Sequence, residues 1–452
     1  MTHEGRALLV DLYELTMAEA YRREGMAARP ATFSLFVRTL PPSRGYLVAA
    51  GLDDALRWLE QLRFGPDELA ALQRLGVFEP TFLEWLGDLR FTGRVRAVPE
   101  GTVVFPHEPM LEVEAPMAEA QLAETFLLNQ LTLQTTLASK AARFRHAAAG
   151  RAVVDFALRR TQGVDAGMKL ARVCGLVGLA GTSNVAGAIR YGVPASGTMA
   201  HSFVQAYRDE VDAFRAFVRT LGDRTVLLVD TYDTHQGVEH AVQVATECRR
   251  EGVSIRGIRL DSGDLAALAR HARRRLDDAG LGDVQVLVSG GLDEHEIHRL
   301  LAKEGAPIDG FGAGSALGVS DDAPVLDTVY KLVAYDGRAV RKTSTGKETW
   351  PAGKQVWRAP DWSHDTLALA DEQPPGTGHR PLLVEVMRDG QRTGPGQRSL
   401  AEANRHFEQE WSAMPEALKD LTAPPEHPLV VSSRLRQLTG ELDRRRTSQE
   451  GQ

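Results

Sequence analysis

The sequence has 452 residues, of which 43% are hydrophobic and 25% charged, as is usual for a globular protein. This length exceeds what one ordinary hydrophobic core supports, so we expect two or three domains. The net charge of −7 gives no electrostatic footprint for nucleic acid, and an anionic ligand would have to be held by local cations.

Cysteine content and the lengths of the apolar runs exclude further classes. Only Cys174 and Cys248 are present, which argues against a disulfide framework and a Cys-rich zinc site. The N-terminus shows no basic start followed by an apolar run, and no stretch approaches the roughly 18 apolar residues of a membrane span. We therefore expect a cytoplasmic protein with no signal peptide and with neither a membrane nor a nucleic acid as its partner.

The first 150 residues predict an α/β domain. Apolar residues recur at helical spacing in several stretches, and Phe33, Leu35 and Val37 share one face of an alternating strand. We expect helices at residues 8–23, 52–62, 67–75 and 119–149, and strands at residues 32–39, 91–104 and 110–115.

Residues 151–328 predict parallel βαβ units, because short apolar strands alternate with helical stretches. Strands are expected at residues 153–158, 176–180, 195–199, 226–229, 255–260, 284–288 and 308–312. Helices are expected at residues 166–174, 184–191, 203–221, 237–252, 265–279 and 294–303. Such a series favours a (β/α) barrel, possibly an incomplete one, over the alternative of a doubly wound open sheet.

Residues 329–452 predict a C-terminal extension that contains β structure. Strands at residues 329–335 and 339–343 flank a turn at Asp336-Gly337. Proline and glycine are frequent at residues 360–395, which predicts a loosely ordered connection before a helix at residues 400–421. The charged tail from Glu441 predicts disorder.

Polar residues follow every expected strand of the barrel, where barrel enzymes gather their functional groups. In chain order these are Arg159-Arg160, Gly181-Thr182-Ser183-Asn184, Thr198 and His201, Asp230, Tyr232 and Asp233, Arg259, Asp261, Ser262 and Asp264, Ser289-Gly290-Gly291, and Gly312-Ala313-Gly314-Ser315.

The last two strand ends predict a phosphate site. Glycine-rich turns that open helices expose backbone N–H groups, and barrels often bind phosphate after their last two strands. Gly290, Gly291, Gly312, Gly314 and Ser315 are the candidate phosphate-binding residues. The alternative is that each glycine pair only forms a tight turn.

The fifth strand end carries both an arginine and carboxylates. Asp261 or Asp264 could accept hydrogen bonds from ribose hydroxyls or hold Mg²⁺ beside phosphate oxygens. Alternatively, Asp261, Ser262 or Asp264 caps the following helix. Arg259 could bind a ligand carboxylate, or form an internal ion pair with Asp230 or Asp261.

The stretch Gly197-Thr198-Met199-Ala200-His201-Ser202 places an imidazole beside a hydroxyl and small residues. We expect His201 to act as a nucleophile at the mouth of the barrel. A lone histidine can also be a hydrogen-bonded core residue, which is the alternative here.

Seven runs of the sequence, in this order, resemble the nicotinate phosphoribosyltransferase family between residues 8 and 358. They are Asp11-Leu12-Tyr13-Glu14-Leu15-Thr16-Met17, Phe156-Ala157-Leu158-Arg159-Arg160, Gly181-Thr182-Ser183-Asn184, Gly197 to Phe203, Asp230-Thr231-Tyr232-Asp233-Thr234, Arg259-Leu260-Asp261-Ser262-Gly263-Asp264 and Gly346-Lys347. The resemblance implies an irregular (β/α) barrel with an N-terminal α/β domain and a β-containing C-terminal extension, usually dimeric with sites at the subunit interface.

The resemblance also implies an activity: nicotinate and phosphoribosyl pyrophosphate give nicotinate mononucleotide and pyrophosphate. ATP is a co-substrate, its hydrolysis is coupled through a phosphorylated histidine at the position of His201, and Mg²⁺ accompanies the phosphates. Tyr13, Thr198 and Arg259 match nicotinate contacts, and Ser315 matches a donor contact where relatives often carry Thr. Arg159 and Arg160 match basic residues near the ligand. The remaining candidates are Asp261 for catalysis, beside the ribose, and the neighbouring hydroxyls of Ser202 and Ser262 for substrate binding.

The sequence departs from the family pattern at His235, usually apolar, and at Thr161, often Ala. The region after Trp357 matches nothing recognisable. Two other functions remain open: a phosphoribosyltransferase for nicotinamide or a related ring, and a catalytically silent ligand-binding relative.

Overall fold

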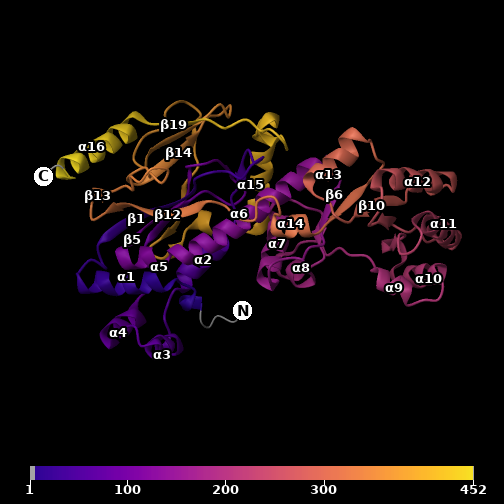
Figure 1. Cartoon of the computed structure of the whole chain (residues 1–452), viewed down its shortest axis with the longest axis horizontal. Helices are drawn as coiled ribbons and strands as arrows, with labels where there is room; N and C mark the ends of the chain where they lie inside the picture. The colour runs from indigo at the N-terminus through magenta and orange to yellow at the C-terminus, as the bar shows by residue number, and fades with distance from the viewer. Residues whose placement is uncertain (1–5, 451–452) are drawn as a thin grey trace. The chain divides into compact units, whose positions relative to one another are not determined.

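A computed structural model describes residues 6–450 of the chain, and the side chains of residues 6–445. By packing, the chain forms two compact units, Met1–Thr136 with Val325–Gln452, and Leu137–Pro324. The two ends of the chain share a unit because strand β12 (Thr328–Tyr335) pairs with strand β1 (Pro30–Val37), as Figure 1 shows. The expected division into three domains at residues 150 and 328 stays a prediction.

A seven-stranded antiparallel sheet organises the first unit, in the order β13-β12-β1-β5-β3-β17-β18. The strand predicted at residues 32–39 is β1, and the predicted turn at Asp336-Gly337 has the positive φ values, 50° and 74°, that a tight hairpin needs. The other strands of this sheet are β3 (Arg94–Ala97), β5 (Pro109–Pro116), β13 (Arg338–Ala339), β17 (Val384–Arg388) and β18 (Gln391–Arg392).

Helices of the first unit pack on its sheets: α5 contacts β1 and β5, and α2 contacts β18. Those predicted near residues 8–23, 52–62 and 67–75 are confirmed as α1, α2 and α3. The helices are α1 (Leu12–Arg23), α2 (Leu52–Gln61), α3 (Pro66–Leu75), α4 (Pro80–Asp88), α5 (Met117–Leu122), α15 (Leu400–Ala413) and α16 (Ser433–Glu450).

Two expectations about the C-terminal part are wrong. Residues 360–395 contribute four strands: β17 and β18 of the large sheet, and β15 (Asp365–Leu369) and β16 (Arg380–Pro381) of a four-stranded sheet completed by β14 (Lys354–Arg358) and β19 (Leu429–Val431). The reason is a buried ion pair, in which Arg358 Nη2 donates to Asp365 Oδ2 at 2.6 Å. Residues 441–450 of the tail are helical in α16, where Asp443 accepts from Arg341 at 2.8 Å, and residues 451–452 lie outside the described part of the chain. Amino-acid composition predicts neither of these ion pairs, because one is buried in the core and the other joins residues that are distant in the sequence.

The second unit contains six parallel strands: β6 (Ala152–Asp155), β7 (Gly181–Thr182), β8 (Val226–Leu228), β9 (Gly257–Leu260), β10 (Gln285–Ser289) and β11 (Gly310–Ala313). Their order is β7-β6-β11-β10-β9-β8, so the last strand pairs back onto the first. Between β7 and β8 the ring is interrupted, and Ala195 contributes a single bridge to Thr182. The fold is therefore the expected irregular (β/α) barrel.

The interruption also corrects two predicted strands. Residues 176–180 are not a strand, because helix α7 (Val164–Leu176) extends to Leu176 and the strand falls on Gly181–Thr182. Residues 195–199 form only the bridge at Ala195, which follows Pro194, a residue without an N–H to donate.

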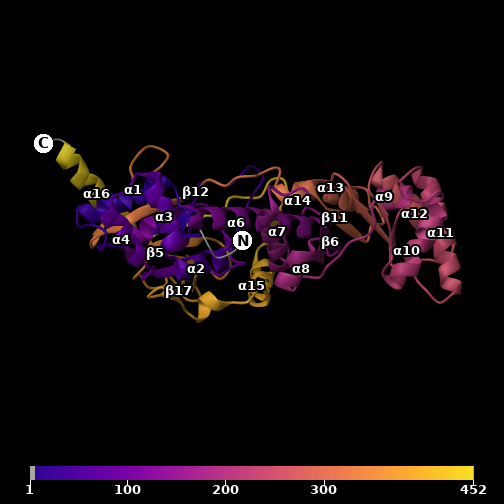
Figure 2. The same cartoon turned by 90° about the horizontal axis from the view of Figure 1, so that it is seen from below.

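Helices alternate with these strands (Figures 1 and 2). The single helix predicted at residues 203–221 is two helices, because Asp209 caps a new one by accepting from the N–H groups of Val211 and Asp212. Besides α7, the helices are α6 (Glu124–Ala147, which begins in the first unit), α8 (Val185–Tyr191), α9 (His201–Gln205), α10 (Glu210–Leu221), α11 (Thr234–Arg250), α12 (Leu265–Asp278), α13 (Glu294–His298) and α14 (Ser315–Val319). Among the residues described, no helix combines the length and the apolar character that crossing a membrane requires.

A buried carboxyl group in the first unit gives a prediction about stability. Glu14 is fully buried on α1 and accepts from the N–H and Oγ1 of Thr125, at 2.8 and 2.7 Å. Burial, reinforced by the negative charges of Glu124 and Asp11, raises the pKa of Glu14 to about 7. The folded protein thus keeps a proton that the unfolded chain loses near pH 4.5, so stability falls as pH rises from about 4.5 to 7.

We expect Glu14→Gln to stabilise the protein by about 1–3 kcal/mol at pH 8 and to have little effect at pH 5. The amide keeps an oxygen that can accept from Thr125 but cannot ionise. Thermal unfolding of both proteins between pH 5 and 8 checks this, with Glu24→Gln on the exposed end of the same helix as the control. Parallel pH profiles for the wild type and Glu14→Gln would contradict it.

Candidate active site

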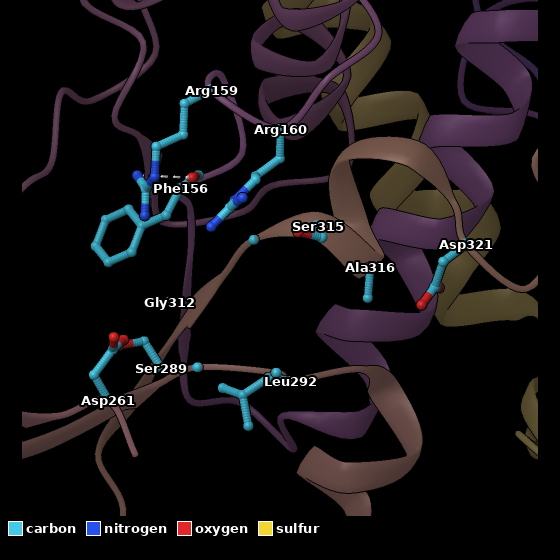
Figure 3. Close-up of a pocket in the computed structure, with 13 residues that line it drawn as sticks. Phe156, Arg159, Arg160, Asp261, Ser289, Leu292, Gly312, Ser315, Ala316 and Asp321 are labelled. Atoms are coloured by element: carbon cyan, nitrogen blue, oxygen red, sulfur yellow. Dashed lines mark hydrogen bonds between the residues drawn. The ribbon is translucent and has the colours of Figure 1, made fainter.

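The ends of strands β6, β9, β10 and β11 surround a cavity of about 270 Å³ in the second unit (Figure 3). Its walls are the turns that follow these strands, so groups far apart in the sequence meet there. The predicted site residues that line it are Arg159, Arg160, Asp261, Gly290, Gly291, Gly312, Gly314 and Ser315.

Steric crowding explains why glycine occupies two positions of these turns. At Gly290, φ is +90° and a Cβ atom would lie 1.8 Å from the carbonyl oxygen of Asp261. At Gly312, a Cβ would lie 2.5 Å from the ring of Phe156. Gly290 thus lets the end of β10 approach the end of β9, and Gly312 lets the end of β11 approach the end of β6, which a side chain would prevent.

The two turns differ in how they meet their helices. Gly314 directly precedes Ser315, the first residue of α14, and no side chain caps that helix. Gly291 is separated from α13 by Leu292 and by Asp293, which caps α13 by accepting from the N–H of Glu296 at 2.6 Å. The expectation that both turns directly open a helix is therefore wrong for the first of them, because Asp293 occupies its helix terminus.

Both arginines that follow β6 line the cavity. Arg159 Nη1 donates to the carbonyl oxygen of Phe156 at 3.4 Å. Arg160 has no hydrogen bond or ion pair from its guanidinium to any described residue, and Figure 3 shows it extending toward the space between Phe156 and Gly312. An exposed cation without a protein partner at this wall suits an anionic ligand.

Asp261 lies where the cavity meets His201. Its Oδ1 accepts from Ser289 Oγ, and its Oδ2 is 3.8 Å from His201 Nε2. The nearby Asp230 is buried and holds this loop, because its Oδ2 accepts from the N–H of Asp261 at 3.1 Å and from Ser262 Oγ at 2.6 Å. The hydroxyl of Ser262 is thus used within the protein rather than directed at the cavity.

One predicted alternative for this loop is confirmed. Asp264 caps α12 by accepting from the N–H of Ala267 at 3.0 Å. Because one residue provides the cap, the carboxylate of Asp261 is left for another use.

His201 is the first residue of α9, and its side chain is 41% exposed. The alternative of a core histidine is therefore wrong. Nδ1 lies 3.2 Å from Thr231 Oγ1, so the hydroxyl orients the ring while Nε2 faces Asp261. Ser202, the next residue on α9, is exposed.

Arg259 lies beneath the His201 segment. Its Nη1 donates to Thr198 Oγ1, and its Nη2 donates to the carbonyl oxygen of Met199 at 3.2 Å. The guanidinium carbon is 5.8 Å from the centre of the Phe156 ring. The alternative ion pair with Asp230 or Asp261 is absent among these described residues, and Nε is buried without a hydrogen-bond partner. Burial lowers the pKa of Arg259, and Arg159 adds to this effect while Asp261 and Asp230 oppose it.

Three residues at the site were not singled out from the sequence. Phe156 and Thr231 stand inside runs that were recognised, but an aromatic ring and a hydroxyl carry no specific signal of their own. Asp321 reaches the cavity wall from beyond α14. Tyr13 belongs to the first unit, on α1, and is 44% exposed, so the second unit alone does not contain every predicted contact.

The donor set at the cavity fits a shared magnesium ion. No group of three or more His, Cys, Asp or Glu side chains in the described part of the chain could hold a metal by itself. Mg²⁺ in nucleotide and phosphate enzymes needs only one or two carboxylates, with phosphate oxygens and water completing its shell. Asp261 offers such a carboxylate beside the glycine turns.

The steric role of Gly290 can be tested by comparing an alanine substitution there with the same substitution at Gly291. Gly290→Ala would overlap the backbone of Asp261, whereas at Gly291, with φ of +63°, an added methyl group would have no atom within 4 Å. We expect inorganic pyrophosphate to raise the melting temperature of the wild type, and Gly290→Ala to weaken that binding by at least about tenfold. Gly291→Ala should retain the shift at a strain cost of about 1 kcal/mol. Equal behaviour of the two variants would contradict the argument.

Two family models and several curated relatives match most of this chain. The family model described as the nicotinate phosphoribosyltransferase (NAPRTase) N-terminal domain matches residues 8–132, and that of the NAPRTase family matches residues 152–340. Nicotinate phosphoribosyltransferase pncB2 of Mycobacterium tuberculosis is 50% identical over 444 residues, covering 97% of this chain and 94% of the relative. The Bacillus subtilis nicotinate phosphoribosyltransferase is 44% identical over 379 residues, covering 81% and 77%.

A solved structure of the same family has a similar fold over almost the whole chain. The crystal structure of human nicotinic acid phosphoribosyltransferase has a TM-score of 0.84 and 30% identity, covering 96% of this chain and 99% of that one. The resemblance predicted from the sequence motifs is thereby confirmed. The chain belongs to the nicotinate phosphoribosyltransferase family.

Proposed function

We propose that this protein transfers the phosphoribosyl group of phosphoribosyl pyrophosphate to nicotinate, giving nicotinate mononucleotide and pyrophosphate in NAD biosynthesis. The observation that carries the proposal is one continuous arrangement in the second unit. A cavity lined by two arginines, glycine turns and Asp261 adjoins an arginine, Arg259, beside the ring of Phe156. The first part suits a sugar phosphate and the second suits an acidic aromatic ring.

Binding of nicotinate would use charge and an aromatic surface. The guanidinium of Arg259, with the hydroxyl of Thr198, would hold the carboxylate, and Phe156 would offer its face to the pyridine ring. Tyr13 of the first unit is the further proposed nicotinate contact. An arginine remains a cation at neutral pH even when burial lowers its pKa, so it favours nicotinate over neutral nicotinamide.

The transfer step breaks the bond between the anomeric carbon and pyrophosphate, and forms a bond from that carbon to the pyridine nitrogen. The nitrogen is already a nucleophile, so orientation and charge stabilisation supply the catalysis. Arg159, Arg160 and the N–H groups of the glycine turns would stabilise the departing pyrophosphate. Asp261 would steady the positive charge that develops on the ribose.

Magnesium would be held by Asp261 together with the donor's phosphates, where it supplies neutralisation of phosphate charge. The residues described at the site fit that role without a protein cage of their own.

ATP coupling through His201 is the second part of the proposal. An imidazole nitrogen would attack the γ-phosphorus of ATP, ADP would leave, and the resulting phosphoramidate would bias a conformational step before hydrolysis returns phosphate. The exposure of His201 and its place between Thr231 and Asp261 support this role.

A homodimer with sites near the subunit interface, located in the cytoplasm, completes the proposal. Helix α8 supports a protein partner, because Val185 and Ile189 on it are 65% and 80% exposed. Val164 at the start of α7, which packs against α8, is 80% exposed. Patches of exposed apolar side chains are typical of contact surfaces, and we propose that these three contribute to one.

The test is pyrophosphate release from phosphoribosyl pyrophosphate with nicotinate or nicotinamide, each with and without ATP. We expect release with nicotinate, faster with ATP, and much less with nicotinamide. Arg259→Met should lower kcat/KM for nicotinate by about 10- to 100-fold, since a charged hydrogen bond is lost, and should reduce the discrimination between the two rings. A preference for nicotinamide would establish the alternative transferase, and tight binding without release would establish a silent relative.

His201→Ala separates the two parts of the proposal. We expect this variant to lose ATP hydrolysis and to keep a slow transfer that ATP does not accelerate, because the phosphate acceptor is gone while the transferase groups remain. ADP formation and nicotinate mononucleotide formation, measured in the same reaction, check this. Gln205→Ala, at the exposed end of the same helix, is the control that should keep coupling. ATP-stimulated turnover by His201→Ala would contradict the role.

A further inference from the structure

A buried lysine lies behind the phosphate cavity and contacts both elements that continue from its glycine turns. Lys140 on α6 is 1% exposed. Its Nζ is 2.7 Å from Glu294 Oε2, 2.7 Å from Asp322 Oδ1 and 3.1 Å from Asp321 Oδ1. Arg143, one turn further along α6, donates from Nε to Glu294 Oε1 at 2.8 Å.

The partners of Lys140 lie on the segments that follow the two turns, at the start of α13 and just after the end of α14. Glu294 is the first residue of α13, four positions after Gly290. Asp321 and Asp322 follow α14, which begins at Ser315 on the cavity wall. Figure 3 shows Asp321 beside Ala316 at this wall. One ammonium group thus connects the segment that leaves the first turn with the segment that leaves the second.

The contacts of Lys140 lie beyond the point where strand pairing holds the two glycine turns at a set separation. The parallel pairing of β10 with β11 ends at Ser289 and Gly312. Beyond those residues the backbone ladder no longer sets the separation of the turns, although the cavity lies between them. The Lys140 contacts restore a defined separation on the far side of both turns.

The ion cluster is better suited to fixing geometry than to adding stability. Burial alone would lower the pKa of Lys140, but Glu294 and Asp322 more than offset it, so the pKa is raised and the lysine stays charged. A buried ion pair recovers little net free energy over an apolar replacement, because desolvation opposes the attraction. Its directional contacts nevertheless permit only a narrow range of positions for its partners.

We propose that Lys140 is a positioning residue that holds the two glycine turns at the separation required to bind the diphosphate of the phosphoribosyl donor. The inference rests on the proposed function for the identity of the donor, but not for the binding of a diphosphate. Lys140 touches no substrate itself and acts through Glu294, Asp321 and Asp322.

The test compares Lys140→Met with Lys140→Arg in the full-length protein. We expect Lys140→Met to raise KM for phosphoribosyl pyrophosphate by about tenfold or more, with kcat and KM for nicotinate changed less than about threefold. Lys140→Arg keeps the charge and should restore the donor KM to within about threefold of the wild type. Isothermal titration with inorganic pyrophosphate should show the same loss and rescue in Kd.

Arg215→Met is the control, at a more exposed ion pair elsewhere in the same unit. It removes an ion pair with Glu247, 2.9 Å long, that joins α10 to α11 in the same unit and involves no residue of the cavity. We expect it to leave the pyrophosphate Kd unchanged. If Lys140→Met does not fold, Asp322→Asn takes its place, since it weakens the contact on the α14 side alone.

The results separate this inference from the proposed function. An unchanged pyrophosphate Kd in a folded Lys140→Met or Asp322→Asn variant would overturn the positioning role, whatever the wild type catalyses. A lower kcat and higher KM values for both substrates, in proportion to the loss of thermal stability, would also overturn it. If the wild type forms no nicotinate mononucleotide, the proposed function fails, and the pyrophosphate titrations still decide the role of Lys140.

Discussion

The pairing of β11 with β6 is the constraint on which the site depends. Phe311 lies opposite Val153 and Ala313 opposite Asp155, so the end of the last strand lies beside the end of the first. This places Arg159 and Arg160, after β6, next to the turn of Gly312 and Gly314, although about 150 positions of sequence separate them. Without that pairing, the cations and the backbone N–H groups would not face a common cavity.

Close packing of the strand ends would cause steric overlap and leave polar groups without hydrogen bonds. Two glycines and a buried aspartate prevent this. Gly290 and Gly312 have no side chain where backbone or ring atoms approach, and Asp230 accepts hydrogen bonds from the N–H of Asp261 and the hydroxyl of Ser262 in the next loop. The side chains that remain free to face a ligand are therefore few. Asp261, Arg160 and the exposed imidazole of His201 are among them, and these are the groups the proposed chemistry needs.

Buried charge recurs as a means of holding polar segments in this protein. Arg358 orders the C-terminal sheet through Asp365, and Lys140 connects the segments behind the glycine turns. Both cations are distant in the chain from some of their partners. The sequence around each of them predicts only an ordinary helix or strand. The failed prediction of a loose region at residues 360–395 has this origin, because composition counts charges but not the partners that bury them.

The sequence by itself determined the strand and helix alternation, the family motifs and the set of polar strand ends, because these depend on local periodicity and on residue type at fixed spacing. The tertiary structure alone decided which polar groups face the cavity. Asp264 became a helix cap and Ser262 a partner of Asp230, while Asp261 stayed beside His201. It also decided that the barrel is interrupted between β7 and β8, since strand pairing is a contact between distant segments and leaves no mark within either one.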